Sequence, residues 1–231
     1  MTVSFGGVHA VRDVDFQVWP REILGLIGPN GAGKTTLINA LTGVLPQNSS
    51  GKVQLTGHDI SSLTSSQRAL RGLVRTFQGA RVFETFTAAE NVEAALLAQR
   101  ESLKTARRVA RGLLSFVGLS EPDIIAGALP YGDQRRLAIA RALAMAPKVL
   151  LLDEPAAGLT DTESEELGAM IHSIRDNYDC GVVLVEHDMK LVMSTCTSIQ
   201  VLVEGETLTR GDVEAVRRDP EVVAAYLGGE V

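Results

Sequence analysis

The stretch "EILGLIGPNGAGKTT", residues 22–36, contains the pattern that decides the fold. A short apolar run ends in a glycine-rich loop that matches G-x-x-x-x-G-K-[ST] from Gly28 to Thr35. The run predicts a buried strand, and the residues after the loop predict a helix that ends near Gly43. In this context glycines let backbone N–H groups surround phosphate oxygens, Lys34 reaches the outer phosphates and Thr35 can bind Mg²⁺. The alternative is a glycine-rich turn with an incidental lysine, and the strand–loop–helix context argues against it.

The composition indicates a globular protein. The chain has 231 residues, is 45% hydrophobic and carries a formal net charge of −6. The acidic balance and the 4% aromatic content argue against a nucleic-acid partner, which would require basic surfaces and stacking rings. No apolar run approaches the roughly 18 residues that span a bilayer, and no signal-peptide pattern follows Met1. Cys180 and Cys196 are interpreted as free thiols in apolar surroundings, so we expect a cytoplasmic protein.

Candidate strands alternate with candidate helices along most of the chain. Alternation or apolar runs predict the strands, at residues 14–19, 51–57, 72–78, 148–153, 181–186 and 199–205. Leu167 and Ile171 lie on the apolar face of a helix between two of these strands. Such alternation predicts a parallel, doubly wound sheet, in which ligands bind beyond the carboxyl ends of the strands.

A helical stretch is predicted to interrupt the strand-rich parts. Thr87 and Glu90 have the spacing of a capping box, Gly118 can end a second helix, and "PYGDQRRLAIARALAMA" predicts a third. We therefore predict a single domain over residues 1–231, with a core of 1–78 and 147–231 and a helical subdomain of 79–146.

Two adjacent carboxylates end the apolar run "VLLLDEPAAG", residues 149–158. Burying charge is costly unless a cation pairs with it. Asp153 is therefore interpreted as the carboxylate that organises Mg²⁺ near the hydroxyl of Thr35, as a P-loop ATPase requires. Glu154 points elsewhere from the next position and can polarise a water for in-line attack on the terminal phosphoryl group. The alternative for Glu154 is a cap on the following helix.

Two further polar residues follow predicted strands. Gln78 ends the strand at 72–78, where it could contact the metal or the attacking water; a surface loop is the alternative. His187 follows the apolar run "VVLV" at the same sheet edge as Asp153. We expect it to hydrogen-bond the γ-phosphate and to fix the attacking water.

Five motifs occur in an order that resembles the ATPase subunits of ABC transporters. They are "GPNGAGKT" (28–35), "TFQ" (76–78), "LPYGDQRRLAIARAL" (129–143), "LLLDEP" (150–155) and "VEHDM" (185–189). The resemblance covers nearly the whole chain. It implies an α/β P-loop NTPase fold with a RecA-like parallel-sheet core, an antiparallel β element near the N-terminus and an inserted helical subdomain. It also implies ATP and Mg²⁺ as cofactors, and Mg²⁺-dependent ATP hydrolysis coupled to transport across a membrane.

The resemblance assigns roles residue by residue. Phe5 is expected to stack on the adenine, with simple core packing as the alternative. The resemblance places nucleotide binding at Phe5, Gly28, Pro29, Asn30, Gly31, Ala32, Gly33, Lys34, Thr35, Thr36, Tyr131, Gly132 and Asp133. It places metal ligands at Thr35, Gln78 and Asp153, and catalytic groups at Glu154, His187 and Gln78.

Finer features are similar to the ATPase subunits of branched-chain amino acid importers. They are "VRTFQGARVFETFTAAENV", "DEPAAGL", "EHDMKLVM" and "DPEVVAAYLG", and urea or amide importers share much of this pattern. The family implies that two ATPase subunits, identical or paralogous, enclose two ATP molecules. Membrane permease subunits would dock around residues 79–92, and a solute-binding protein would act with them. The subunit would then lie at the cytoplasmic face of the inner or plasma membrane.

Three departures from the family pattern bear on activity. In the signature, which is commonly L-S-G-G-Q, Pro130 and Tyr131 replace Ser and Gly, and Asp133 replaces Gln. Thr160 stands where Asp or Asn is usual. The family also has a strand before the Phe5 segment, so either the start is misassigned or an edge strand is short. Two rival interpretations remain open: an ABC ATPase of translation or DNA repair, and a nucleotide-binding module with weak hydrolysis.

Overall fold

A parallel sheet forms the centre of the molecule. The structure is a computed structural model that describes residues 1–77 and 79–227. The central sheet has the strand order β11-β10-β3-β9-β8-β7. Its strands are β3 (Ile23–Ile27), β7 (Leu73–Arg75), β8 (Val149–Asp153), β9 (Gly181–Val185), β10 (Ser198–Val203) and β11 (Glu206–Asp212). All neighbours pair in parallel except the edge strand β11, which confirms the predicted parallel core. Every residue of β3 and β9 is buried, which explains why these strands are continuously apolar.

Antiparallel strands lie near the N-terminus, as the family resemblance implies. β1 (Thr2–Phe5) pairs with β2 (Val8–Val11) and β4 (Ser49–Ser50), and β5 (Gln54–Leu55) pairs with β6 (His58–Asp59).

The predicted strand at 14–19 is wrong, although its pattern of burial is right. Val14 is buried, Phe16 and Val18 are half-buried, and Asp15 and Gln17 are exposed, so the side chains alternate as expected. The segment is nevertheless in no strand ladder. Alternation indicates which side chains face the core, but it does not show that a neighbouring strand is available for pairing.

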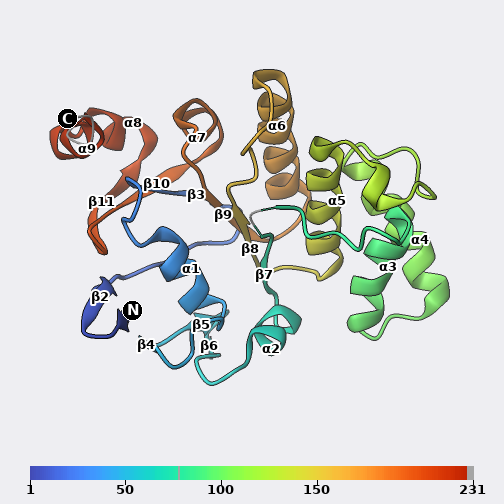
Figure 1. Cartoon of the computed structure of the whole chain (residues 1–231), viewed down its shortest axis with the longest axis horizontal. Helices are drawn as coiled ribbons and strands as arrows, with labels where there is room; N and C mark the ends of the chain where they lie inside the picture. Colours follow the sequence, from blue (N-terminus) through green and yellow to red (C-terminus); the bar gives the residue numbers. More distant parts are fainter. Residues whose placement is uncertain (78, 228–231) are drawn as a thin grey trace.

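Several helices flank the sheet, and three others form a separate lobe (Figure 1). The flanking helices are α1 (Lys34–Leu41), α2 (Ser65–Leu70), α6 (Asp161–Asn177), α7 (Met189–Thr195), α8 (Val213–Arg218) and α9 (Pro220–Leu227). The lobe contains α3 (Ala88–Ala98), α4 (Leu103–Phe116) and α5 (Tyr131–Ala144), with a short 3₁₀ turn at Ala126–Ala128. These three helices pack against one another, to the right of the sheet in Figure 1.

The predicted helix ends are confirmed. The Thr87 side chain accepts from the N–H of Glu90, and the Glu90 carboxylate accepts from the N–H of Thr87, which is the predicted capping box. Gly43 and Gly118 follow α1 and α4 with φ of 76° and 81°, values that favour glycine.

One hydrophobic core cluster continues from the sheet into the helical lobe. It joins Ile23 and Leu150 of the sheet to Val92 and Leu137 of the lobe. A second cluster lies around α1 and includes Leu37 and the other side of the sheet. Both cysteines are free and buried, and burial raises the pKa of Cys180 to about 11 and that of Cys196 to about 12. They act as small apolar residues, as expected.

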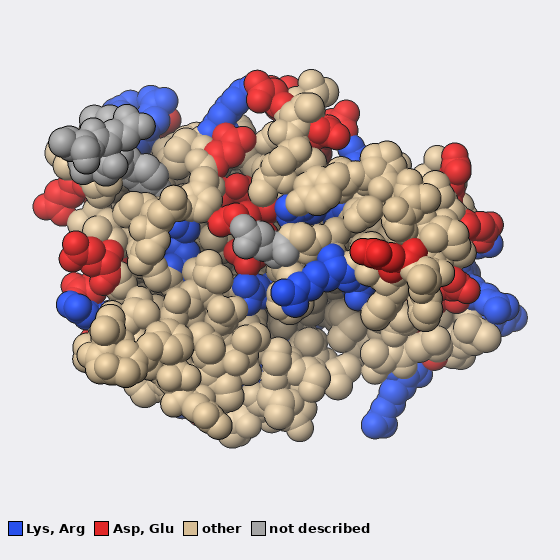
Figure 2. Space-filling model, in the orientation of Figure 1, with Lys and Arg blue, Asp and Glu red and all other residues tan. Residues whose placement is uncertain are grey.

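Two surface properties bear on partners. In the described part of the chain no helix is both long and apolar enough to cross a bilayer. In the face shown in Figure 2, basic side chains lie beside acidic ones, and no continuous basic surface suited to a nucleic-acid backbone is visible.

Candidate active site

The sheet brings the predicted polar residues to one edge. The glycine-rich loop follows β3, Asp153 ends β8, and Glu186 and His187 follow β9, which lies between those two strands. Asp153 is paired with Val185, and the N–H of Glu154 donates to the Val185 carbonyl at 2.8 Å. The carboxyl ends of parallel strands thus form the candidate site, where such sheets bind ligands.

The loop from Gly28 to Thr35 is closed against neighbouring backbone. A Cβ at Gly28 would lie 2.0 Å from the Leu202 carbonyl oxygen, and one at Gly33 would lie 2.5 Å from the Ala10 oxygen. Gly33 has φ of 96° and directly precedes α1. The glycines are therefore required by close approach as well as by backbone conformation. The rest of the predicted loop is Pro29, Asn30, Gly31, Ala32, Lys34, Thr35 and Thr36, of which Asn30, Gly31 and Thr35 are exposed.

Lys34 lies inside this loop. Its Nζ donates to the carbonyl oxygens of Gly28 at 2.6 Å and Pro29 at 3.1 Å, and the residue is buried. Burial lowers the pKa of Lys34, and the charges of Glu154 and Asp153 oppose that shift. The lysine is thus within electrostatic reach of both predicted carboxylates.

Asp153 has a protein cation as its partner. The Nη2 of Arg75 on β7 lies 2.6 Å from Oδ2 of Asp153, and both side chains are buried. The other terminal nitrogen of Arg75 donates to the side-chain oxygen of Asn39 on α1. Arg75 is thus a cation for this carboxylate besides the Mg²⁺ predicted from the sequence.

Glu154 and His187 are brought together as expected. The His187 Nε2 and Glu154 Oε1 atoms lie 3.0 Å apart. Glu154 has φ of 46°, which is uncommon for a residue other than glycine and is often found at functional sites. This conformation lets Glu154 leave the strand in a different direction from Asp153, and it places a carboxylate beside an imidazole. Such a pair can accept a proton from a water and orient that water.

Glu186 fixes the backbone next to both Glu154 and His187. It is buried, and its carboxylate accepts from the N–H groups of Ala156 at 2.6 Å and His187 at 3.1 Å. Desolvation raises the pKa of Glu186, whereas the hydrogen bonds from the backbone lower it. One carboxylate thus fixes both the segment after Glu154 and the start of the His187 segment.

The signature segment begins α5. Pro130 is the N-cap residue, Tyr131 is the first residue of the helix and is 47% exposed, and Gly132 follows it. Asp133 lies 3.7 Å from Nε of Arg136, so this arginine is the one placed to screen it.

Arg135 joins the signature segment to the loop that carries Glu154. Its guanidinium donates to the carbonyl oxygens of Glu154 at 3.0 Å and Ala157 at 3.3 Å, and to the hydroxyl of Tyr131 at 2.5 Å. It also lies over the Tyr131 ring. This contact between the two segments was not predicted from the sequence.

Phe5 and Gln78 are the remaining residues of the predicted site. Phe5 ends β1 at the turn into β2 and is 41% exposed, so it is not a core residue. Gln78 lies outside the described residues.

The donor set fits Mg²⁺ that arrives with a nucleotide. In residues 1–77 and 79–227 no group of three or more His, Cys, Asp or Glu side chains could hold a metal by itself. The predicted protein ligands in that part are the Thr35 hydroxyl and the Asp153 carboxylate. Magnesium is usually held by one or two carboxylates together with substrate phosphates, so this small oxygen set is the type expected.

Arg75 and Glu186 could have been suspected from the sequence. Each is a charged residue in or next to an apolar strand, at positions 75 and 186, where burial requires a partner. The sequence does not show which strand lies next to β7, so the partner of Arg75 could not be assigned.

Comparison with known proteins identifies the family. The ABC transporter family model matches residues 11–157, which is more than half of the chain. The chain belongs to the ABC transporter family. A second model, for branched-chain amino acid ATP-binding cassette transporters, matches residues 206–231.

Curated relatives of this ABC protein are similar over nearly their whole length. The high-affinity branched-chain amino acid transport ATP-binding protein BraF of Pseudomonas aeruginosa is 42% identical, covering 99% of this chain and 95% of the relative. The protein LivG of Escherichia coli, of the same description, is 41% identical with the same coverage. The lipopolysaccharide export ATP-binding protein LptB of Haemophilus influenzae is 36% identical over 97% of this chain and 93% of its own.

Solved ABC cassettes share the fold. An ATP-binding cassette of an ABC transporter in its ADP conformation is 28% identical, with a TM-score of 0.87 over 98% of this chain and 96% of that one. A dimeric cassette bound to ADP and phosphate is 25% identical, with a TM-score of 0.79 over 92% and 95%. These matches confirm the P-loop NTPase fold and the assignment as an ATP-hydrolysing transporter cassette.

Proposed function

We propose that this chain is the ATP-hydrolysing subunit of an importer for branched-chain amino acids. The observation that carries the proposal is the 41–42% identity, over nearly full length, to the BraF and LivG subunits. The match of residues 206–231 to the branched-chain model supports the same solute class.

The roles of the site residues are part of this proposal. Lys34 and the N–H groups of the glycine-rich loop bind the phosphates. Thr35, Gln78 and Asp153 hold Mg²⁺, which supplies positive charge to the phosphate oxygens. Glu154 accepts the proton of the attacking water, and His187, 3.0 Å from it, orients that water and the γ-phosphate. Phe5 stacks on the adenine.

The proposed assembly contains two ATPase subunits. Tyr131, Gly132 and Asp133 complete the site of the other subunit, whether identical or paralogous, since they lie at the N-terminus of α5 where N–H groups face outward. The dimeric cassette that binds ADP and phosphate has a similar fold, which supports this arrangement.

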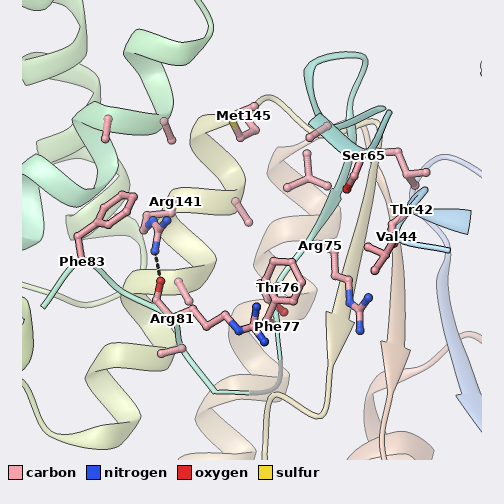
Figure 3. A pocket seen from close by; sticks show the side chains of 18 residues that line it. Thr42, Val44, Ser65, Arg75, Thr76, Phe77, Arg81, Phe83, Arg141 and Met145 are labelled. Atoms are coloured by element: carbon pink, nitrogen blue, oxygen red, sulfur yellow. Dashed lines mark hydrogen bonds between the residues drawn. The ribbon is translucent and has the colours of Figure 1, made fainter. Parts of the chain in front are cut away.

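Permease subunits are proposed to dock around residues 79–92, where the helical subdomain, residues 79–146, meets the core of 1–78 and 147–231. Phe83 and Phe86 are each 45% exposed, and their rings lie 5.4 Å apart. Phe83 borders a pocket of about 500 Å³ between the two parts. In Figure 3, Phe83 and Arg141 lie on one wall of this pocket, with Thr42 and Ser65 on the opposite side. Through these permeases the chain would be held at the cytoplasmic face of the membrane.

Reconstitution with its permeases and solute-binding protein tests the solute. In vesicles, leucine, isoleucine and valine should each stimulate ATP hydrolysis and be taken up. Stimulation by urea or an amide alone would replace the proposed solute with that class. Hydrolysis that no amino acid, urea or amide stimulates would contradict importer function for these solutes.

A further inference from the structure

Arg75 makes contacts that the proposed catalytic roles do not require. Its side chain is 7% exposed and lies 2.6 Å from Oδ2 of Asp153, whose side chain is 4% exposed. Its second terminal nitrogen binds Asn39 on α1, and its guanidinium lies 5.2 Å from the centre of the Phe77 ring. The side chain thus joins β7, β8 and the helix that follows the phosphate loop.

Cationic and anionic side chains already lie around Asp153 in the described residues. Asp153 and Glu154 supply the negative charges, and Arg75 and Lys34 supply the positive ones. A divalent cation added alone would face the buried guanidinium that already pairs with Asp153. A nucleotide brings further negative charge with its phosphates.

We propose that Arg75 is the counter-ion of Asp153 in the nucleotide-free chain, and that it prevents Asp153 from binding a divalent cation until nucleotide phosphates are present. This proposal rests on the proposed role of Asp153 as a metal ligand. Arg75 is a positioning residue, because it touches the carboxylate and not the reacting atoms. Its contact with Asn39 also fixes α1 relative to β8. The same side chain therefore positions the helix that carries Thr35 relative to the strand that carries Asp153.

Thermal unfolding of the nucleotide-free chain, with EDTA or with millimolar Mg²⁺, tests this proposal. The Tm of the wild type should be the same in both solutions. Arg75→Met leaves a buried carboxylate unpaired, so its Tm in EDTA should fall by roughly 6–20 °C. Mg²⁺ should restore part of that loss, because Asp153 then binds the metal. Arg75→Lys should keep the charge, and Mg²⁺ should not raise its Tm.

Two further variants make the result specific. Arg81→Met removes another arginine that lies over the Phe77 ring, at 4.5 Å, but it leaves the Asp153 pair intact. This control should keep the wild-type Tm within a few degrees and show no response to Mg²⁺. The double variant Arg75→Met/Asp153→Asn removes both charges, so it should regain stability in EDTA and lose the response to Mg²⁺. It also provides a folded sample if Arg75→Met alone does not fold.

The proposal is wrong if Mg²⁺ raises the Tm of the nucleotide-free wild type as much as that of Arg75→Met. It is also wrong if Asp153→Asn in the Arg75→Met background neither restores stability nor removes a response to Mg²⁺. Either result can occur while ATP hydrolysis by the wild type remains Mg²⁺-dependent. The failure of this inference is therefore distinguishable from the failure of the proposed function.

Discussion

At the scale of single residues, conformation and burial place the reactive groups. Asp153 and Glu154 are adjacent in sequence, yet one pairs with Arg75 and the other contacts His187. The positive φ of Glu154 makes this divergence possible. Its cost in backbone strain, on the order of 1–3 kcal/mol, is offset by the hydrogen bonds that fix the loop, among them that from Arg135 to the Glu154 carbonyl.

Phe5→Ala should weaken ATP and GTP binding alike. An exposed ring that stacks on a base contributes about 1–3 kcal/mol and does not read base edges. We expect both dissociation constants to rise at least about fivefold and GTP to remain within about tenfold of ATP, as measured by nucleotide titration. Unchanged ATP affinity in this variant would rule out the stacking role.

At the scale of secondary-structure elements, local signals explain most of the fold. The unusual Thr160 is the N-cap of α6, and its side chain and the Glu163 carboxylate form a capping box. The departure from the family pattern therefore has a structural role that the sequence analysis did not recognise, although the spacing of Thr160 and Glu163 was visible.

Thr160→Ala should lower the free energy of unfolding by about 1 kcal/mol, and the Tm by roughly 2–4 °C, because the cap is lost. Thr160→Asp keeps a capping oxygen and should remain close to the wild type. Ser173→Ala, an exposed change within α6, is the matched control. Equal thermal unfolding of the wild type and Thr160→Ala would mean that the capping box does not stabilise α6.

The elements that the sequence predicts well are those with a local cause. The strand β3, the capping box at Thr87 and the helix end at Gly118 follow from neighbouring residues alone. The strand expected at 14–19 fails because a strand needs a partner, which is a property of tertiary structure. The Arg75 contact was missed for the same reason, since residues 75 and 153 meet only through the pairing of β7 with β8.

At the scale of the whole molecule, the proposed activity depends on surfaces that would meet other chains. Phe83 and Phe86 are each 45% exposed, so neither is packed fully inside the helical lobe. Tyr131 is also exposed and is linked through Arg135 to the loop that carries Glu154.

Phe83→Asp should abolish solute-stimulated hydrolysis and transport in reconstituted vesicles, while basal hydrolysis by the isolated chain stays within about twofold of the wild type. An exposed aromatic residue often dominates a docking surface, and a charge would be costly to bury there. Leu103→Asp, at another exposed apolar residue of the lobe (49% exposed), serves as the matched control and should keep transport. Normal transport by Phe83→Asp would remove this residue from the proposed interface.

Pro130→Ser with Asp133→Gln should stabilise an ATP-bound dimer. Serine supplies a hydroxyl that can bind phosphate, an interaction of about 1.5–3 kcal/mol, and glutamine removes a negative charge that Arg136 screens from 3.7 Å. In the Glu154→Gln background, size-exclusion chromatography should show more dimer with ATP than the unmodified loop gives. A tight ATP-bound homodimer with the unmodified loop would contradict this argument.

The central claim is that Glu154, held beside His187, drives ATP hydrolysis that powers transport. The most direct test is phosphate release by the reconstituted transporter with Mg²⁺ and leucine, measured for the wild type and for Glu154→Gln. We expect Glu154→Gln to bind ATP as the wild type does and to release phosphate about 10²–10⁴ times more slowly. Wild-type turnover in Glu154→Gln would contradict the account.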